Sequence, residues 1–261
     1  MSVVDRSAAR VSVRVFSKVP EVTVLFWVIK VLTTGMGETT SDYLAKTYDP
    51  VLAVGAVGVI FVLSLTVQLL ARRYVAAVYW FAIVMVSVFG TMVADVIHVR
   101  FGVPYAVSTV GFAIALAAIF GGWYLCERTL SIHSIRTMRR ELFYWAAVLA
   151  TFALGTAVGD LTATTLHLGY FASGVLFAVV IAVPAVAHSR FGMNPVLAFW
   201  FAYVTTRPLG ASFADWLGVP PARHGLNLGT GAVSLTLAVV IACLVGYLAV
   251  TRVDVEAPEV D

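Results

Sequence analysis

Long apolar runs recur along the whole chain, separated by short segments that contain charged residues, proline or glycine. Each run has about 20 residues, the length that an α-helix needs to cross the hydrocarbon core of a bilayer. The pattern therefore predicts eight membrane-spanning helices. Their expected ranges are 21–41, 51–71, 75–97, 103–126, 141–166, 169–188, 195–217 and 226–250.

The composition agrees with a polytopic membrane protein and excludes several other classes. Of the 261 residues, 61% are hydrophobic and 12% are charged, and the mean hydropathy is +0.94. A soluble domain carries about 25% charged residues. The net charge of +3 is too small to indicate a polyanionic partner, so nucleic-acid binding is not expected. Cys126 and Cys243 each lie in an apolar run, at a spacing that predicts neither a disulfide framework nor a thiolate metal site.

Basic residues are distributed unequally between the two sides of the predicted bundle. Twelve lie in an N-terminal tail (1–19, with Arg6, Arg10 and Arg14) or after an even-numbered span, and three lie on the opposite side. By the positive-inside rule, both termini are expected in the cytoplasm. An even number of spans agrees with this orientation.

The odd-numbered spans share a pattern of three residues. A tryptophan precedes an aspartate by fifteen positions, and a glycine precedes the same aspartate by five. The tryptophans are Trp27, Trp80, Trp145 and Trp200, the glycines are Gly37, Gly90, Gly155 and Gly210, and the aspartates are Asp42, Asp95, Asp160 and Asp215. The fourfold match predicts four parallel copies of a hairpin of two transmembrane helices, related by an axis along the membrane normal.

These copies predict one all-α membrane domain that occupies residues 1–261. The four repeats are expected at about 20–73, 74–128, 138–190 and 194–252, after a cytoplasmic tail of residues 1–19. Since each copy contains two spans, every copy inserts in the same direction. The four aspartates are therefore expected at similar depth near the outer face, and the four tryptophans near the inner face.

The repeat resembles a family of bacterial inner-membrane proteins that consist of tandem repeats of unknown function. Each repeat of that family has two transmembrane regions, a tryptophan and a glycine–aspartate motif, often followed by tyrosine and lysine. The clearest match is SDYLAK at 41–46, in which serine replaces the glycine; GDLTAT at 159–164 keeps Gly-Asp, and ADVIHV and ADWLGV keep only the aspartate. The resemblance implies the eight-helix architecture and a location in a bacterial inner (plasma) membrane, and it implies no activity.

The four aspartates are the first candidates for a functional site. A charge inside a bilayer costs about 2.5–3.5 kcal/mol on insertion scales and normally faces a protein interior or a water-filled cavity. Asp42, Asp95, Asp160 and Asp215 are therefore expected to converge near the axis, joined by Glu38, which lies one helical turn before Asp42. In the alternative interpretation, the aspartates are solvated helix ends, and their repetition records only a duplicated ancestor.

The glycines and tryptophans have structural interpretations. The glycines either allow close helix packing or break the helices so that each aspartate caps a following turn. The tryptophans are interpreted as packing residues or interfacial anchors.

Three further residues complete the predicted site. His98 follows Asp95 by one helical turn, which is compatible with a shared divalent metal, and the four aspartates and Glu38 are the other expected ligands. Lys30 and Arg207 are basic residues inside spans, and each is interpreted as a counter-ion to a carboxylate or as a charge that displaces the substrate cation. In the alternative, Lys30 extends to the inner interface.

The sequence thus favours a secondary transporter for a cation, with a divalent metal ion as the preferred substrate and proton exchange through the carboxylates as an option. Two other classes stay open: a membrane-embedded enzyme that acts on a lipid or quinone, and a channel or structural subunit. No cofactor is expected except a divalent metal as substrate. The expected partners are the lipid bilayer, the metal ion or protons and, as an option, further copies of the chain.

Overall fold

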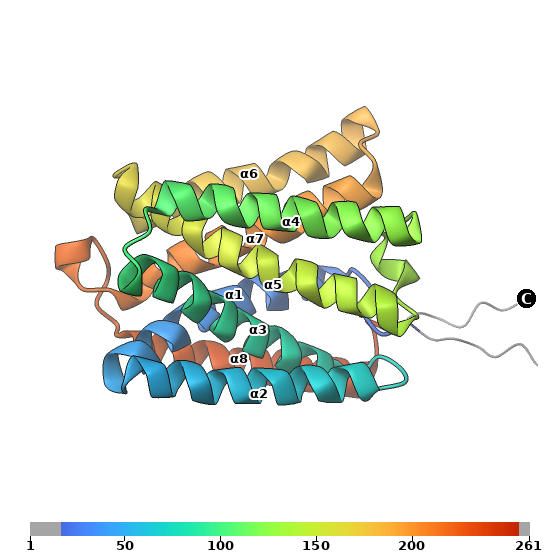
Figure 1. Cartoon of the computed structure of the whole chain (residues 1–261), viewed down its shortest axis with the longest axis horizontal. Coiled ribbons are helices and arrows are strands. Elements are labelled where there is room, and N and C mark those ends of the chain that lie inside the picture. Colours follow the sequence, from blue (N-terminus) through green and yellow to red (C-terminus); the bar gives the residue numbers. More distant parts are fainter. Residues whose placement is uncertain (1–16, 256–261) are drawn as a thin grey trace, which may run out of the picture.

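Each predicted span corresponds to one long helix in the computed structural model, which describes residues 17–255 (Figure 1). Arg6, Arg10 and Arg14 of the expected cytoplasmic tail lie outside the described residues. The helices are α1 (Val24–Thr47), α2 (Pro50–Leu70), α3 (Ala76–Asp95), α4 (Tyr105–Glu127), α5 (Met138–Asp160), α6 (Tyr170–Phe191), α7 (Pro195–Gly218) and α8 (Thr230–Thr251).

The described residues form an all-helical bundle without β-strands, as expected. Six of the eight helices are long and apolar enough to cross a membrane, namely α2, α3, α4, α5, α6 and α8. The remaining two, α1 and α7, are the helices that carry Lys30, Glu38 and Arg207 in their interior. Length and composition therefore identify six candidate spans and do not include α1 and α7 among them.

Local capping explains where several helices begin. Asp49 accepts hydrogen bonds from the backbone N–H groups of the first turn of α2, and Asn194 does the same for α7. A proline follows each of these caps at the first helical position, where its missing N–H costs nothing. Thr23 and Thr137 cap α1 and α5 through their hydroxyl oxygens.

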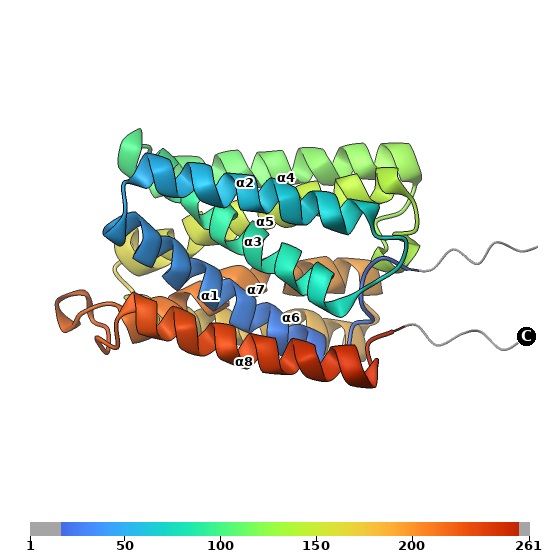
Figure 2. The same cartoon turned by 90° about the horizontal axis from the view of Figure 1, so that it is seen from below.

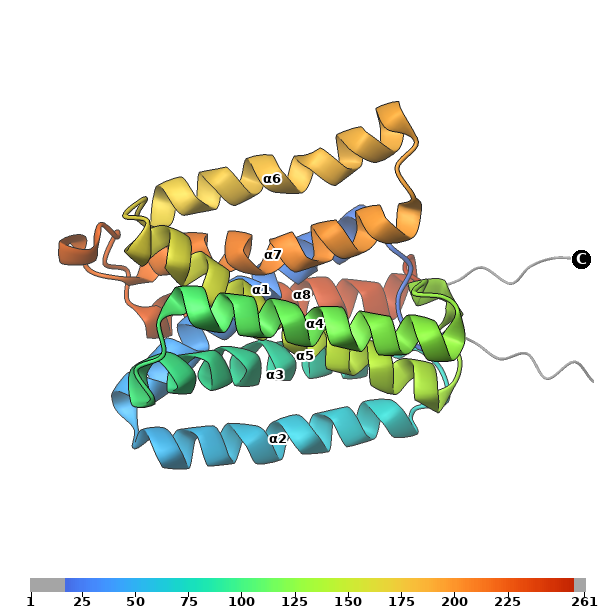
Figure 3. The ribbon, with the colours of Figure 1, turned by 45° about the horizontal axis from the view of Figure 1, so that its top comes forward.

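The odd-numbered helices form a closed inner ring in which α1 packs on α3, α3 on α5, α5 on α7 and α7 on α1. Each even-numbered helix lies outside this ring and packs chiefly against the inner helix of the following repeat: α2 on α3, α4 on α5, α6 on α7, and α8 back on α1 (Figures 2 and 3). The covalent hairpin of the predicted repeat is therefore not the main packing unit. Neighbouring repeats cover one another in a cycle.

The repeated glycines join the inner helices. A Cβ atom on Gly37, Gly90, Gly155 or Gly210 would lie 1.8–2.9 Å from the nearest atom of the next repeat, namely Ser87, Phe152, Arg207 and Thr34 respectively. These four contact residues share one repeat position, eight before the aspartate. Because the fourth contact returns to the first repeat, the series closes the ring. Close packing is thus confirmed as the role of these glycines, and helix breaking is wrong, since all four helices continue through them.

The first and last described residues lie at the same end of the bundle, which we call the tail end (Figure 2). The four repeated aspartates lie near the C-terminal ends of α1, α3, α5 and α7, at the opposite end, which we call the aspartate end.

Candidate functional site

Asp95 and Asp160 differ from the other two repeated aspartates in their backbone setting. Each is the last α-helical residue before a single turn of π-helix, Val96–Arg100 after Asp95 and Leu161–Thr165 after Asp160. In α1 and α7 the chain stays α-helical beyond the aspartate. Single π-helical turns are rare and occur frequently at functional sites. Two of the four repeats therefore carry a distinct local structure at their aspartate.

The carboxylates lie within electrostatic range of one another at the aspartate end. Asp95, Asp160 and Asp215 each interact with the charges of Glu38 and Asp42. We call these five residues the acidic cluster. Asp215 is buried, with 6% of its surface exposed. Asp95 accepts a hydrogen bond from the Ser41 hydroxyl at 3.1 Å, and Asp42 pairs with Lys46 on the more exposed side of α1.

The Arg207 guanidinium lies at the centre of the inner ring. The residue is fully buried, and its Nη2 donates to Glu38 Oε2 at 2.6 Å and to Thr156 Oγ1 at 2.8 Å, as well as to Thr91 Oγ1. Its Nη1 donates to the Thr34 carbonyl at 2.5 Å. One side chain of α7 thus connects all three other inner helices. Arg207 is a counter-ion to Glu38, one of the two roles expected for it.

Three partners of Arg207 occupy one position of the repeat. Glu38, Thr91 and Thr156 each lie four residues before their aspartate, and Ala211 holds this position in the fourth repeat, which supplies the arginine. Thr91 was not among the predicted residues. Aligning the repeats on their aspartates provides the signal that identifies it.

Lys30 does not pair with a carboxylate. Only 1% of its surface is exposed, and its Nζ lies 4.0 Å from the centroid of the Phe152 ring and 4.2 Å from that of Tyr203. Among residues 17–255, no hydrogen-bond acceptor is within reach of its amine. Contrary to the expectation, Lys30 is therefore not the counter-ion of a carboxylate, and its side chain does not extend to the membrane interface, as in the alternative. Cation–π contacts with two aromatic rings hold the amine instead.

His98 is held by the connection between α3 and α4. Its Nδ1 is hydrogen-bonded to the Val103 carbonyl at 3.0 Å, its Nε2 to the Ser108 hydroxyl at 3.3 Å, and its ring packs on Tyr105. Within the described part of the chain, no three His, Cys, Asp or Glu side chains are placed to hold one metal ion. A metal bound by His98 and the carboxylates stays a prediction.

A surface cavity leads to Asp95. It lies at the aspartate end between α1, α2 and α3, has a volume of about 570 Å³, and is lined by Ser41, Met92, Val96 and Arg100 beside Asp95 itself. Of the acidic cluster, Asp95 is therefore the member that lines this cavity.

Aromatic packing and a polar network join the helices at the tail end. Near its start, each inner helix carries an aromatic residue directly before the repeated tryptophan. Rings from different repeats pack together, for example Tyr79 with Trp145 at 5.7 Å between centroids. Lys18 Nζ pairs with the fully buried Glu141 at 2.6 Å. Burial raises the pKa of the Tyr74 hydroxyl, which donates to Asp254 Oδ2 at 2.5 Å. The two ends of the bundle therefore differ in chemistry: the aspartate end carries the acidic cluster, and the tail end carries the aromatic rings and the Lys18–Glu141 pair.

The comparisons with known proteins concern the repeat. A family described as a repeat of unknown function, DUF347, matches residues 25–74, 78–129, 143–194 and 198–254. This result confirms the resemblance to tandem repeats that the tryptophan, glycine and aspartate pattern indicated. No curated protein and no solved structure matches the chain. Because the four matched segments cover most of its length, the chain belongs to the family built from the DUF347 repeat.

Proposed function

We propose that the protein is an integral membrane secondary transporter for a cation, with a divalent metal ion as the first substrate class to test. The observation that carries this proposal is the acidic cluster in a bundle of apolar helices, approached through the cavity beside Asp95. Acidic residues are costly inside a bilayer, and they typically mark ion pathways or proton relays.

In this proposal all eight helices cross the membrane, including α1 and α7. Their charged residues Lys30, Glu38 and Arg207 are buried against other helices and would therefore not meet lipid. The tail end would face the cytoplasm because basic residues lie there: Arg72 and Arg128 follow α2 and α4, and Arg190 is in the last turn of α6 (Figure 1).

The acidic cluster supports exchange between protons and a cation. Five carboxylates that repel one another favour the binding of positive charge, and a proton or a metal cation can supply it. Glu38 belongs to this cluster and also pairs with Arg207. A bound cation that competes for Glu38 would weaken this ion pair and, with it, the contact between α1 and α7. Binding and release of the cation would therefore change how the inner helices pack against one another.

The central position of Arg207 favours a transporter over a channel along the axis. A guanidinium that connects all four inner helices obstructs such a pore and places a positive charge in the path of a cation. Passage of the substrate would then require rearrangement of the inner ring, which is the behaviour of a secondary transporter.

The proposal is tested by the metal content of cells that express the protein, measured by mass spectrometry across a panel of divalent metals. We expect one metal to change in wild-type cells and to return to the level of cells without the protein in the Asp95→Asn and Asp160→Asn variants. Asn has nearly the shape of Asp and cannot carry its charge.

The control is Glu21→Gln, which makes the same chemical change at the tail end, outside the acidic cluster. Membrane abundance of each variant is measured by immunoblot. An unchanged metal content for wild type, or wild-type transport in both aspartate variants, would contradict the proposal.

A further inference from the structure

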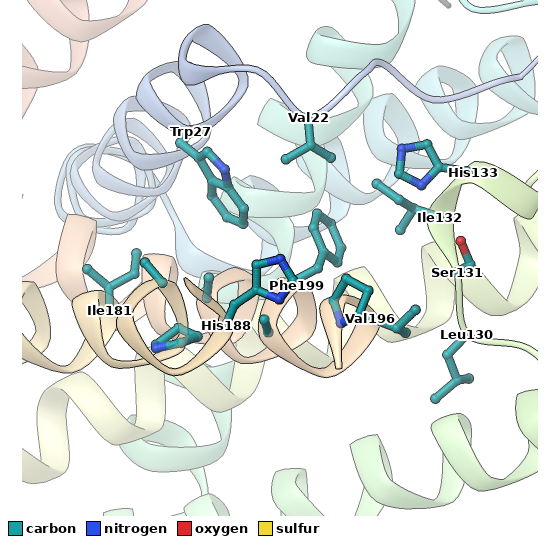
Figure 4. Close-up of a pocket in the computed structure, with 15 residues that line it drawn as sticks. Val22, Trp27, Leu130, Ser131, Ile132, His133, Ile181, His188, Val196 and Phe199 are labelled. Carbon is teal, nitrogen blue, oxygen red and sulfur yellow. The ribbon is translucent and has the colours of Figure 1, made fainter. Parts of the chain in front are cut away.

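A second cavity lies at the tail end, remote from the acidic cluster. It is bounded by the start of α1, the segment 130–133 before α5, and the helices α6 and α7 (Figure 4). Its volume is about 700 Å³, and its walls are mainly apolar, with Val22, Trp27, Ile132, Pro184, Val196 and Phe199 among them. Ser131, His133 and His188 are its polar lining residues.

This cavity is a place where the four repeats differ. Trp80, Trp145 and Trp200 are buried by protein, with 1%, 3% and 4% of their surface exposed. The equivalent Trp27 is only half-buried, and it lies beside Phe199 with one side toward the cavity (Figure 4). Trp27 is therefore less covered by protein than the equivalent tryptophans of the other three repeats.

The geometry of α6 accounts for the missing cover. Pro184 lies inside α6, and the helix diverges from α7 toward its C-terminal end, where Ile181, Pro184 and His188 line the cavity (Figure 3). A proline in a helix removes one backbone hydrogen bond and bends the helix. The space next to Trp27 is thus left between helices that are packed together elsewhere.

We propose that this cavity binds one acyl chain of a phospholipid. Its α7 residues lie within 195–202, the first two turns of the helix, which span about 10 Å from the tail end. That depth includes the headgroup layer and the upper part of the acyl chains. Apolar walls do not hold ordered water, whereas Ser131, His133 and His188 suit the polar headgroup region.

The size of the cavity selects an acyl chain over a helix of another protein. A helix with its side chains is about 10–12 Å in diameter, so two turns of it need roughly 900–1,200 Å³. The cavity provides about 700 Å³. This inference requires that the bundle spans a bilayer, and it is independent of transport.

The test uses the protein reconstituted in phosphatidylcholine bilayers, in which the lipid is brominated near the carboxyl end of one acyl chain. Bromine quenches tryptophan fluorescence on contact. The emission of Trp27 is obtained as the difference between wild type and Trp27→Phe. We expect brominated lipid to remove more than half of this difference, and lipid brominated near the methyl end to remove less.

A cavity-filling variant separates binding in the cavity from general exposure to lipid. Ala198→Phe places a ring inside the cavity, and the quenching of Trp27 should fall at least twofold, each protein being compared with its own Trp27→Phe partner. Leu197→Phe is the matched control, since Leu197 is 57% exposed and does not line the cavity, and it should leave the quenching unchanged. Absence of quenching in wild type, equal quenching in Ala198→Phe, or quenching that disappears at high protein-to-lipid ratio because a second copy covers the site would each overturn the proposal.

Discussion

Among single residues, Arg207 and Glu38 form the ion pair that joins the inner helices in the interior of the bundle. Their pair is almost completely removed from solvent. Thr91 and Thr156 are less dependent on the guanidinium, because their hydroxyl groups also donate to the carbonyls of Ser87 and Phe152 one turn earlier. Loss of Arg207 therefore leaves one group seriously unpaired, the Glu38 carboxylate.

Removal of either member of this pair should be strongly destabilising. We expect Glu38→Met and Arg207→Met each to lower the free energy of unfolding by about 3–5 kcal/mol, because each leaves one buried charge without its partner. The double variant should lose less than either single variant, since neither member of the pair is left buried without its partner. Reversible unfolding in mixed micelles measures all three. A double variant whose loss equals the sum of the single losses would show that the charges do not interact.

Among elements, the inner helices depend on the repeated glycines for their close approach. A methyl group on Gly210 would lie 1.8 Å from the Thr34 hydroxyl oxygen and 2.6 Å from the Val31 carbonyl oxygen. The carbonyl belongs to the backbone of α1 and cannot rotate away. The contact between α7 and α1, which closes the ring, is therefore the one least able to accept a side chain.

This geometry predicts opposite effects for two Gly→Ala substitutions in helices. Gly210→Ala should destabilise the protein by about 1–3 kcal/mol or more through overpacking. Gly111→Ala in α4 has open space around the new methyl group and should be neutral or stabilising by up to about 1 kcal/mol, since alanine favours a helix. Thermal unfolding of the two variants in one detergent provides the comparison. Equal melting temperatures would show that the ring relaxes without cost.

Across the whole molecule, the repeats are connected cyclically by packing. The outer helix of each repeat covers the inner helix of the next, and α8 covers α1. The two described chain ends meet at the tail end, where the Glu21 amide donates to the Asp254 carbonyl at 2.9 Å. The chain could therefore begin and end at another connection of the tail end without a change in how the helices pack.

A circular permutant should consequently fold. Joining residue 255 to residue 17 by a flexible linker and opening the chain in the exposed connection at 192–194 keeps both termini at the tail end and all helix contacts intact. We expect its melting temperature to stay within a few degrees of wild type, measured by thermal unfolding in detergent. Deletion of α8 is the contrasting change and should prevent stable folding, because α1 loses its cover. Aggregation of the permutant would contradict the cyclic interpretation.

The sequence predicts the helices and the repeat well because both depend on local spacing. Apolar runs locate all eight helices, and the offsets of Trp27, Gly37 and Asp42 recur in every repeat. Contacts between repeats are not encoded by such offsets. The partner of Lys30 could not be foreseen for this reason, since Phe152 and Tyr203 belong to the third and fourth repeats. The packing of α2 on α3 rather than on α1 is likewise decided by side-chain fit between segments.

Each outer helix covers the inner helix of the next repeat and not that of its own, and this arrangement bears on how the molecule could have originated. A single two-helix unit could not have covered its own inner helix, so an ancestor with one repeat would have existed as a homotetramer with swapped arms. In such a tetramer, every residue near the axis occurs four times. An arginine at the position of Arg207 would have brought four guanidinium groups into one cross-section, and a lysine at the position of Lys30 four amines. A single chain with diverged repeats has no such restriction, and it places one arginine and one glutamate at its centre.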